Sequence, residues 1–68
     1  MQKWDYLIVQ YSYDDLKNKI ISIQISNGST FSRVKFSALI DTLNQLGKEG
    51  WEIITSEQGI YHLKRPVE

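Results

Sequence analysis

The sequence contains no cysteine and only one histidine, His62. The lack of cysteine excludes disulfides, thiolate catalysis and cysteine-ligated zinc or iron–sulfur clusters. His62 has neither a second histidine nor a Glu-x-x-His pattern beside it, so we expect no metal site. Nothing in the spacing around it supports a Ser-His-Asp triad. We therefore expect no catalytic residue, no cofactor and no enzyme activity.

Net charge is also absent, because eight lysines and arginines balance eight aspartates and glutamates. This balance gives no electrostatic reason to expect nucleic acid or an anionic membrane as a partner. No stretch approaches the ~20 apolar residues of a membrane span. Residues 1–6 lack the apolar run of a signal peptide. We expect a cytoplasmic protein with no membrane partner.

Sixty-eight residues leave room for one core, so residues 1–68 are expected to form a single domain. Aromatic and β-branched residues recur with a period near two in residues 4–11 and 19–25, which predicts two strands. Residues 51–56 and 60–65 predict two more, with Pro66 ending the last.

Between the second and third of these strands lies a predicted helix, residues 37–48. At 100° per residue, five of its positions fall within one arc of about 120°, namely Leu39, Ile40, Leu43, Leu46 and Gly47.

The ends of this helix also carry signals. Ser37 is the expected N-cap, and Gly50 is expected at the left-handed C′ position that ends many helices. Gly47 lies inside the apolar arc, where its bare backbone is expected to let the helix approach the sheet closely. The preceding segment, residues 31–36, reads either as a strand or as an irregular entry into the helix.

The predicted fold class is α+β, with ββαββ connectivity. Two hairpins flank one helix, which covers one face of a four-stranded antiparallel sheet. If the crossover that contains the helix spans the first strand, the strand order is 2-1-3-4 and every neighbour is antiparallel.

Three stretches of the chain resemble a known family. They are WDY at residues 4–6, LNQLGKEGWE at residues 43–52 and LKRP at residues 63–66. With these, the sequence resembles the domain of unknown function numbered 4177, a family of small bacterial and phage proteins. The resemblance is weak between about residues 14 and 36. It implies the fold and carries no agreed activity, cofactor or catalytic residue.

A single helix covers only one face of such a sheet, so the other face is left open. The strand phases place a mostly apolar set of side chains on that second face, and a contiguous apolar patch usually marks an interface. We expect a non-enzymatic interaction module, most simply a homo-oligomer, with Glu52 and Lys64 at the rim. A different protein is the rival partner for this face. The expected interface residues are Trp4, Tyr6, Ile8, Ile54, Ile60 and His62.

A second interpretation concerns the alternation of aromatic and cationic residues before the helix. Phe31, Arg33 and Lys35, joined by Arg65, are candidates for a small anionic ligand, such as a nucleotide-like molecule held between subunits of a phage-type oligomer. The simpler interpretation is a loop whose phenylalanines pack inward while its cations stay in water. A ligand site requires these cations to converge with an aromatic ring.

Overall fold

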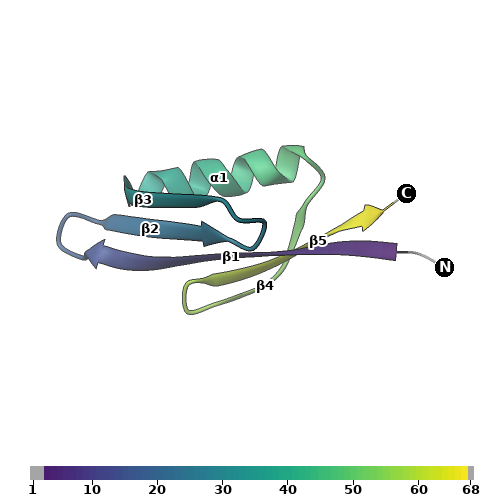
Figure 1. Cartoon of the computed structure of the whole chain (residues 1–68), viewed down its shortest axis with the longest axis horizontal. Coiled ribbons are helices and arrows are strands. Elements are labelled where there is room, and N and C mark those ends of the chain that lie inside the picture. Colours follow the sequence, from purple (N-terminus) through teal and green to yellow (C-terminus); the bar gives the residue numbers. More distant parts are fainter. Residues whose placement is uncertain (1–2, 68) are drawn as a thin grey trace.

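The computed structural model describes residues 3–67, which form one sheet with a helix packed on one of its faces (Figure 1). Along the chain the elements are β1 (Lys3–Asp15), β2 (Ile20–Ile25), β3 (Thr30–Lys35), α1 (Phe36–Lys48), β4 (Glu52–Glu57) and β5 (Ile60–Val67). The class is therefore α+β with one helix, as predicted. Residues 31–36, which the sequence left ambiguous, lie mainly in strand β3.

The sheet has five strands in the order β3-β2-β1-β5-β4, and every neighbouring pair is antiparallel. The prediction of four strands was wrong, and so was the order 2-1-3-4. The predicted ββαββ connectivity roughly fits, with the strand β3 added before the helix. The additional strand β3 explains the wrong order, because it reverses the direction in which the chain enters α1. The strand after the helix, β4, then runs parallel to β1, so an antiparallel sheet must place β5 beside β1.

Strand β1 is longer than predicted, and its two halves have different neighbours. From Lys3 to Gln10 it pairs with β5, and from Val9 to Asp15 it pairs with β2. The two flanks of the sheet are consequently offset along β1, and the molecule measures 47 × 20 × 18 Å.

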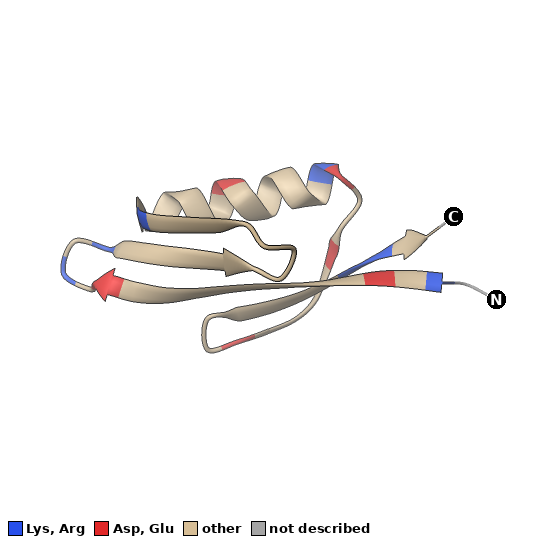
Figure 2. Ribbon diagram, viewed as in Figure 1, with Lys and Arg blue, Asp and Glu red and all other residues tan. Residues whose placement is uncertain are grey.

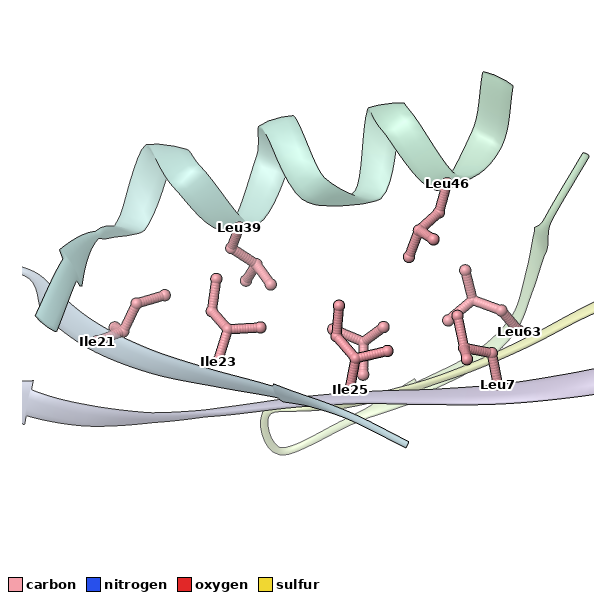
Figure 3. Close-up of a cluster of buried hydrophobic side chains, with 8 residues drawn as sticks. Leu7, Ile21, Ile23, Ile25, Leu39, Leu46 and Leu63 are labelled. Atoms are coloured by element: carbon pink, nitrogen blue, oxygen red, sulfur yellow. The ribbon is translucent and has the colours of Figure 1, made fainter. Parts of the chain in front are cut away.

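The core lies between α1 and the sheet (Figure 3). Alternate residues of β1, β2 and β5 point toward the helix, as the period of two predicted, and two leucines of α1 point toward the sheet. The buried residues are Leu7, Val9, Ile21, Ile23, Ile25, Leu39, Leu46 and Leu63.

The helix begins one residue earlier than predicted and ends as predicted. Its N-cap is Lys35, with no side-chain cap, so the Ser37 prediction was wrong. At the other end, Gly50 has a φ of 95°. The Gly50 N–H donates to the Gly47 carbonyl at 3.1 Å, and the Trp51 N–H donates to the Leu46 carbonyl at 3.1 Å. These two bonds form the Schellman motif and confirm Gly50 as the C′ residue.

Two other expectations were wrong. Gly47 is exposed, and a Cβ added there would meet no atom within 4 Å, so no close helix–sheet contact requires a glycine. Pro66 does not end the last strand but lies within β5, opposite Trp4. The pairing of β5 with β4 ends at Lys64, so at Pro66 the strand β5 pairs only with β1 and forms an edge of the sheet. Edge positions tolerate proline.

The helix α1 is the only helix within residues 3–67, and it is too short and too polar to cross a membrane.

Candidate functional site

The face of the sheet that α1 leaves uncovered, called the open face below, carries the largest group of exposed apolar side chains. On β1 these are Trp4, Tyr6 and Ile8, which alternate with inward-pointing residues such as Leu7. Tyr6 is 68% exposed and Ile8 is 40% exposed. Side chains of this size are usually covered in an isolated domain, so their exposure makes the open face the candidate site.

Strand β5 brings its own residues beside those of β1. Ile8 lies opposite His62, and Gln10 lies opposite Ile60. Opposed residues of an antiparallel pair project from the same face, with Cβ atoms roughly 4.5–5.5 Å apart. Tyr6 lies opposite Lys64 in the same way. The register therefore gathers five of the six predicted interface residues into one patch across β1 and β5.

Ile54, the sixth predicted residue, lies on the neighbouring edge strand β4. Ile53 pairs with Leu63 and Thr55 pairs with His62, so Ile54 is the extra residue of a β-bulge. A bulge places two residues opposite one, and Ile54 therefore lies between the positions opposite Leu63 and His62. It is exposed like the others.

A cation covers one end of the patch. The Nζ atom of Lys64 lies 4.1 Å from the centroid of the Trp4 ring, which is cation–π geometry. Glu52, the other predicted rim residue, lies opposite Lys64 across the β4–β5 pair. The two charges thus border the aromatic end of the patch.

The other half of the open face is polar. Beyond Ile8 the face continues with Gln10, Ser12, Ser22 and Gln24. The Gln10 amide Nε2 donates to Gln24 Oε1 at 2.8 Å, and the Ser22 hydroxyl donates to Asp14. These two hydrogen bonds join polar residues within this half. The polar half limits the apolar patch to the half formed by β1 and β5.

A shallow hollow of about 280 Å³ lies at the boundary between the two halves. It is lined by Ile8, Gln10, Gln24, Ile25 and Ser26. Ser26 follows the last residue of β2 and is hydrogen-bonded to β1. Its N–H donates to the Ile8 carbonyl and its hydroxyl accepts from the Ile8 N–H, both at 2.9 Å. The hollow mixes apolar and amide groups and contains no charged side chain.

The four residues proposed for an anionic ligand do not converge within one chain. Phe31, Arg33 and Lys35 lie on the edge strand β3, which pairs with β2. Arg65 pairs with Asp5 near the opposite end of β1. Arg65 lies on β5, so two strands, β2 and β1, separate it from β3.

Arg65 has partners where it lies. Its guanidinium carbon is 4.4 Å from the centroid of the Trp51 ring. Its Nη1 donates to the Glu49 carbonyl at 3.4 Å, at the end of the helix, and its Nε lies 3.7 Å from an Asp5 carboxylate oxygen. These contacts connect the C-terminal end of α1 to the strands below it, which is a structural role.

Phe31 lines a second hollow, of about 350 Å³, between α1 and the β2–β3 turn. The charged side chains in this hollow are Asp41 and Glu49, both acidic. Two carboxylates disfavour an anion, so this hollow does not suit the nucleotide-like ligand that the sequence suggested. More widely, basic and acidic residues both occur at each end of the long axis (Figure 2).

The pKa values of one tyrosine, Tyr11, and one aspartate, Asp15, are shifted. Both residues lie away from the patch. Burial raises the pKa of the Tyr11 hydroxyl, and the neighbouring Tyr61 and Tyr13 add to this effect. The side-chain and backbone hydrogen bonds from Asn18 lower the pKa of Asp15. Within residues 3–67, no three histidine, cysteine or acidic side chains gather as metal ligands.

No protein family, curated protein or solved structure shows significant similarity to this chain. The resemblance to the family of unknown function numbered 4177 remains a prediction. The candidate site therefore rests on its own geometry.

Proposed function

We propose that this domain is a non-enzymatic interaction module that self-associates through the apolar half of its open face. The observation that carries this proposal is the register of β1 and β5, which gathers Trp4, Tyr6, Ile8, Ile60 and His62 into one exposed patch. Contiguous exposed patches of this kind are typical of protein interfaces.

The surface of this chain is large for its mass. The chain exposes 5090 Å², whereas a monomeric protein of 8.0 kDa exposes about 4,500 Å². Its radius of gyration is 12.7 Å, compared with about 11 Å for a compact domain of this length. The elongated shape therefore leaves more surface exposed than a compact domain of this mass has.

A second copy is the partner that best fits this face. Pairing about a two-fold axis covers the same patch on both chains and stops further growth. The chain has no net charge, so two copies do not repel each other through their overall charge. The rim charges of Lys64 and Glu52 have opposite signs, which allows each to face its opposite across the axis.

Light scattering on a sizing column tests this proposal. The unmodified domain is expected to show at least twice the chain mass of 8.0 kDa at micromolar concentration. Ile8→Glu places a charge in the patch without touching the core, and it is expected to lower the mass while circular dichroism shows the fold unchanged. Gln24→Glu is the matched control, because it adds the same charge on the polar half of the same face.

Two results would contradict the proposal. One is a mass of 8.0 kDa for the unmodified domain. The other is an oligomer whose mass Ile8→Glu leaves unchanged. Binding of a different protein by a monomeric domain would identify the rival partner.

A further inference from the structure

The single histidine of the chain, His62, lies inside the apolar patch of the open face. It is exposed, whereas the next residue, Leu63, points into the core. On β1 it lies opposite Ile8, and on β4 it lies opposite Thr55. Directly opposed residues have Cβ atoms roughly 4.5–5.5 Å apart, so the cross-strand neighbours of the imidazole on both sides are uncharged.

The charged and titratable groups that share this surface occupy the diagonal positions around His62. On its own strand the group is Lys64, two residues along the same face. On β4 Glu52 lies opposite Lys64, and Glu57 lies at the end of the strand. On β1 the group is Tyr6, which also lies opposite Lys64. Diagonal neighbours in a regular strand pair are roughly 7–8 Å apart.

None of these groups offsets a positive charge on His62 directly. Lys64 has the same sign as a protonated imidazole, and the nearest acid beside it, Glu52, lies directly opposite Lys64 itself. No ion pair joins His62 to an acidic side chain within residues 3–67. Water is therefore the main stabiliser of a charged imidazole on this face.

We propose that protonation of His62 dissociates the open-face contact, so that self-association depends on pH. This inference rests on the proposed function, because it requires a second copy to cover the patch. Covering the patch removes the imidazoles of both chains from water, and a buried charge without a partner is strongly unfavourable. Each chain therefore releases the proton of His62 when the contact forms.

The direction of the effect follows from this proton release. Histidine is the side chain that ordinarily changes charge between about pH 5 and 8, whereas glutamate, lysine and tyrosine ordinarily do not. The chain has no net charge while His62 is neutral, so protonation gives both copies a positive charge and adds repulsion between them. With one proton released by each of two chains, the dissociation constant rises by up to about one hundredfold for each unit that the pH falls.

Light scattering over a range of concentrations, at about pH 7.5 and about pH 5.5, tests this inference. The unmodified domain is expected at a multiple of the chain mass of 8.0 kDa at the higher pH and to dissociate at the lower pH. His62→Gln is expected to associate equally at both, because its amide is polar and does not titrate. His62→Lys keeps a charge in the patch and is expected to show the single-chain mass at both.

A matched control moves the histidine within the same face. The double variant His62→Gln with Gln24→His has its single histidine on the polar half, outside the proposed contact. It is expected to associate equally at both pH values. Circular dichroism at each pH verifies that the fold is retained.

The outcomes distinguish this inference from the proposed function. A single-chain mass for the unmodified domain at about pH 7.5 would contradict the proposed function. An oligomer whose dissociation constant is the same at both pH values, or changes equally in His62→Gln, would contradict the role of His62 alone. Tighter association at the lower pH would also contradict it, since an acid of the other copy would then bind the charged imidazole. If acid unfolds the chain, His62→Lys at the higher pH decides, because an oligomer there would show that the contact accepts the charge.

Discussion

Among single residues, Arg33 has a backbone conformation that its side chain does not favour. Its φ is 52°, in the left-handed region, where a residue with a Cβ is strained by about 1–2 kcal/mol. Ser32 and Arg33 together oppose one position of β2, because Ile21 pairs with Val34 and Ile23 with Phe31. The strain therefore belongs to a β-bulge in the edge strand, and such a bulge discourages pairing of that edge with other chains.

Replacing Arg33 with glycine is expected to stabilise the fold. Relief of about 1–2 kcal/mol of strain exceeds the roughly 0.5–1 kcal/mol that glycine loses in chain entropy. The expected net gain in the free energy of unfolding is roughly 0.5–1 kcal/mol, measured by denaturant melts. Arg33→Ala is the control, since it removes the charge but keeps the Cβ, and it is expected to give no gain. Equal stability of the two variants would show that the bulge does not strain this residue.

The pKa of Asp15 makes a second residue-level prediction. Hydrogen bonds from the side chain and the backbone N–H of Asn18 stabilise the carboxylate, so its pKa in the folded chain lies below the ordinary value. At pH values above the ordinary aspartate pKa of about 3.9, this lowered pKa stabilises the folded chain. The stabilisation is lost as the pH falls through the pKa of the folded chain. Asn18→Ala is expected to move the pKa of Asp15 up toward its ordinary value.

An NMR titration of the Asp15 carboxyl carbon measures this change directly. Asn44→Ala, on the exposed side of α1, is the matched control and is expected to leave the titration unaltered. A pKa for Asp15 that stays low in Asn18→Ala would show that another group holds the carboxylate ionised.

At the scale of elements, the C-terminal end of α1 depends on Gly50. The Schellman motif requires a left-handed residue at C′, and the φ of 95° there suits glycine. Gly50→Ala is expected to lower the free energy of unfolding by about 1 kcal/mol. Gly50→Asn is expected to cost less, because asparagine tolerates this region better. Denaturant melts in which alanine and asparagine are both neutral would contradict this role.

The elements also show where sequence patterns suffice. Strands β1, β2 and β5 follow from the period of two, and the cap follows from the spacing of Leu46, Gly50 and Trp51. Strand β3 was ambiguous because the bulge at Arg33 separates its two apolar residues, Phe31 and Val34, by three positions and hides the period. The wrong strand order then followed from that one ambiguous element.

The sequence also predicts some parts of the candidate surfaces better than others. The period of two was enough to place Trp4, Tyr6 and Ile8 on the open face, because β1 is regular there. On α1, an arc of about 120° grouped Ile40 and Gly47 with the core leucines, but both residues are exposed. The structure divides that arc, because α1 presents only its Leu39 and Leu46 side fully to the sheet. Arg33 and Arg65 do not converge. Whether two distant residues meet depends on the fold, and sequence spacing does not determine it.

At the scale of the whole molecule, the thin shape follows from one helix and one long twisted sheet. A chain of this size has few core residues to offset the entropy lost on ordering. Covering the open face in a second copy adds apolar burial at about 25 cal/mol per Å². Association and folding stability are therefore expected to be coupled in this domain.

The most direct measurement of the central claim is an isotope-filtered NMR experiment on a mixture of labelled and unlabelled chains, which detects only contacts between copies. The proposed function predicts intermolecular contacts from the Ile8 and Ile60 methyl groups to the Trp4 and Tyr6 rings. These contacts are expected to vanish in Ile8→Glu and to persist in Gln24→Glu. A spectrum of the unmodified domain in which no open-face residue contacts the other copy would contradict the account.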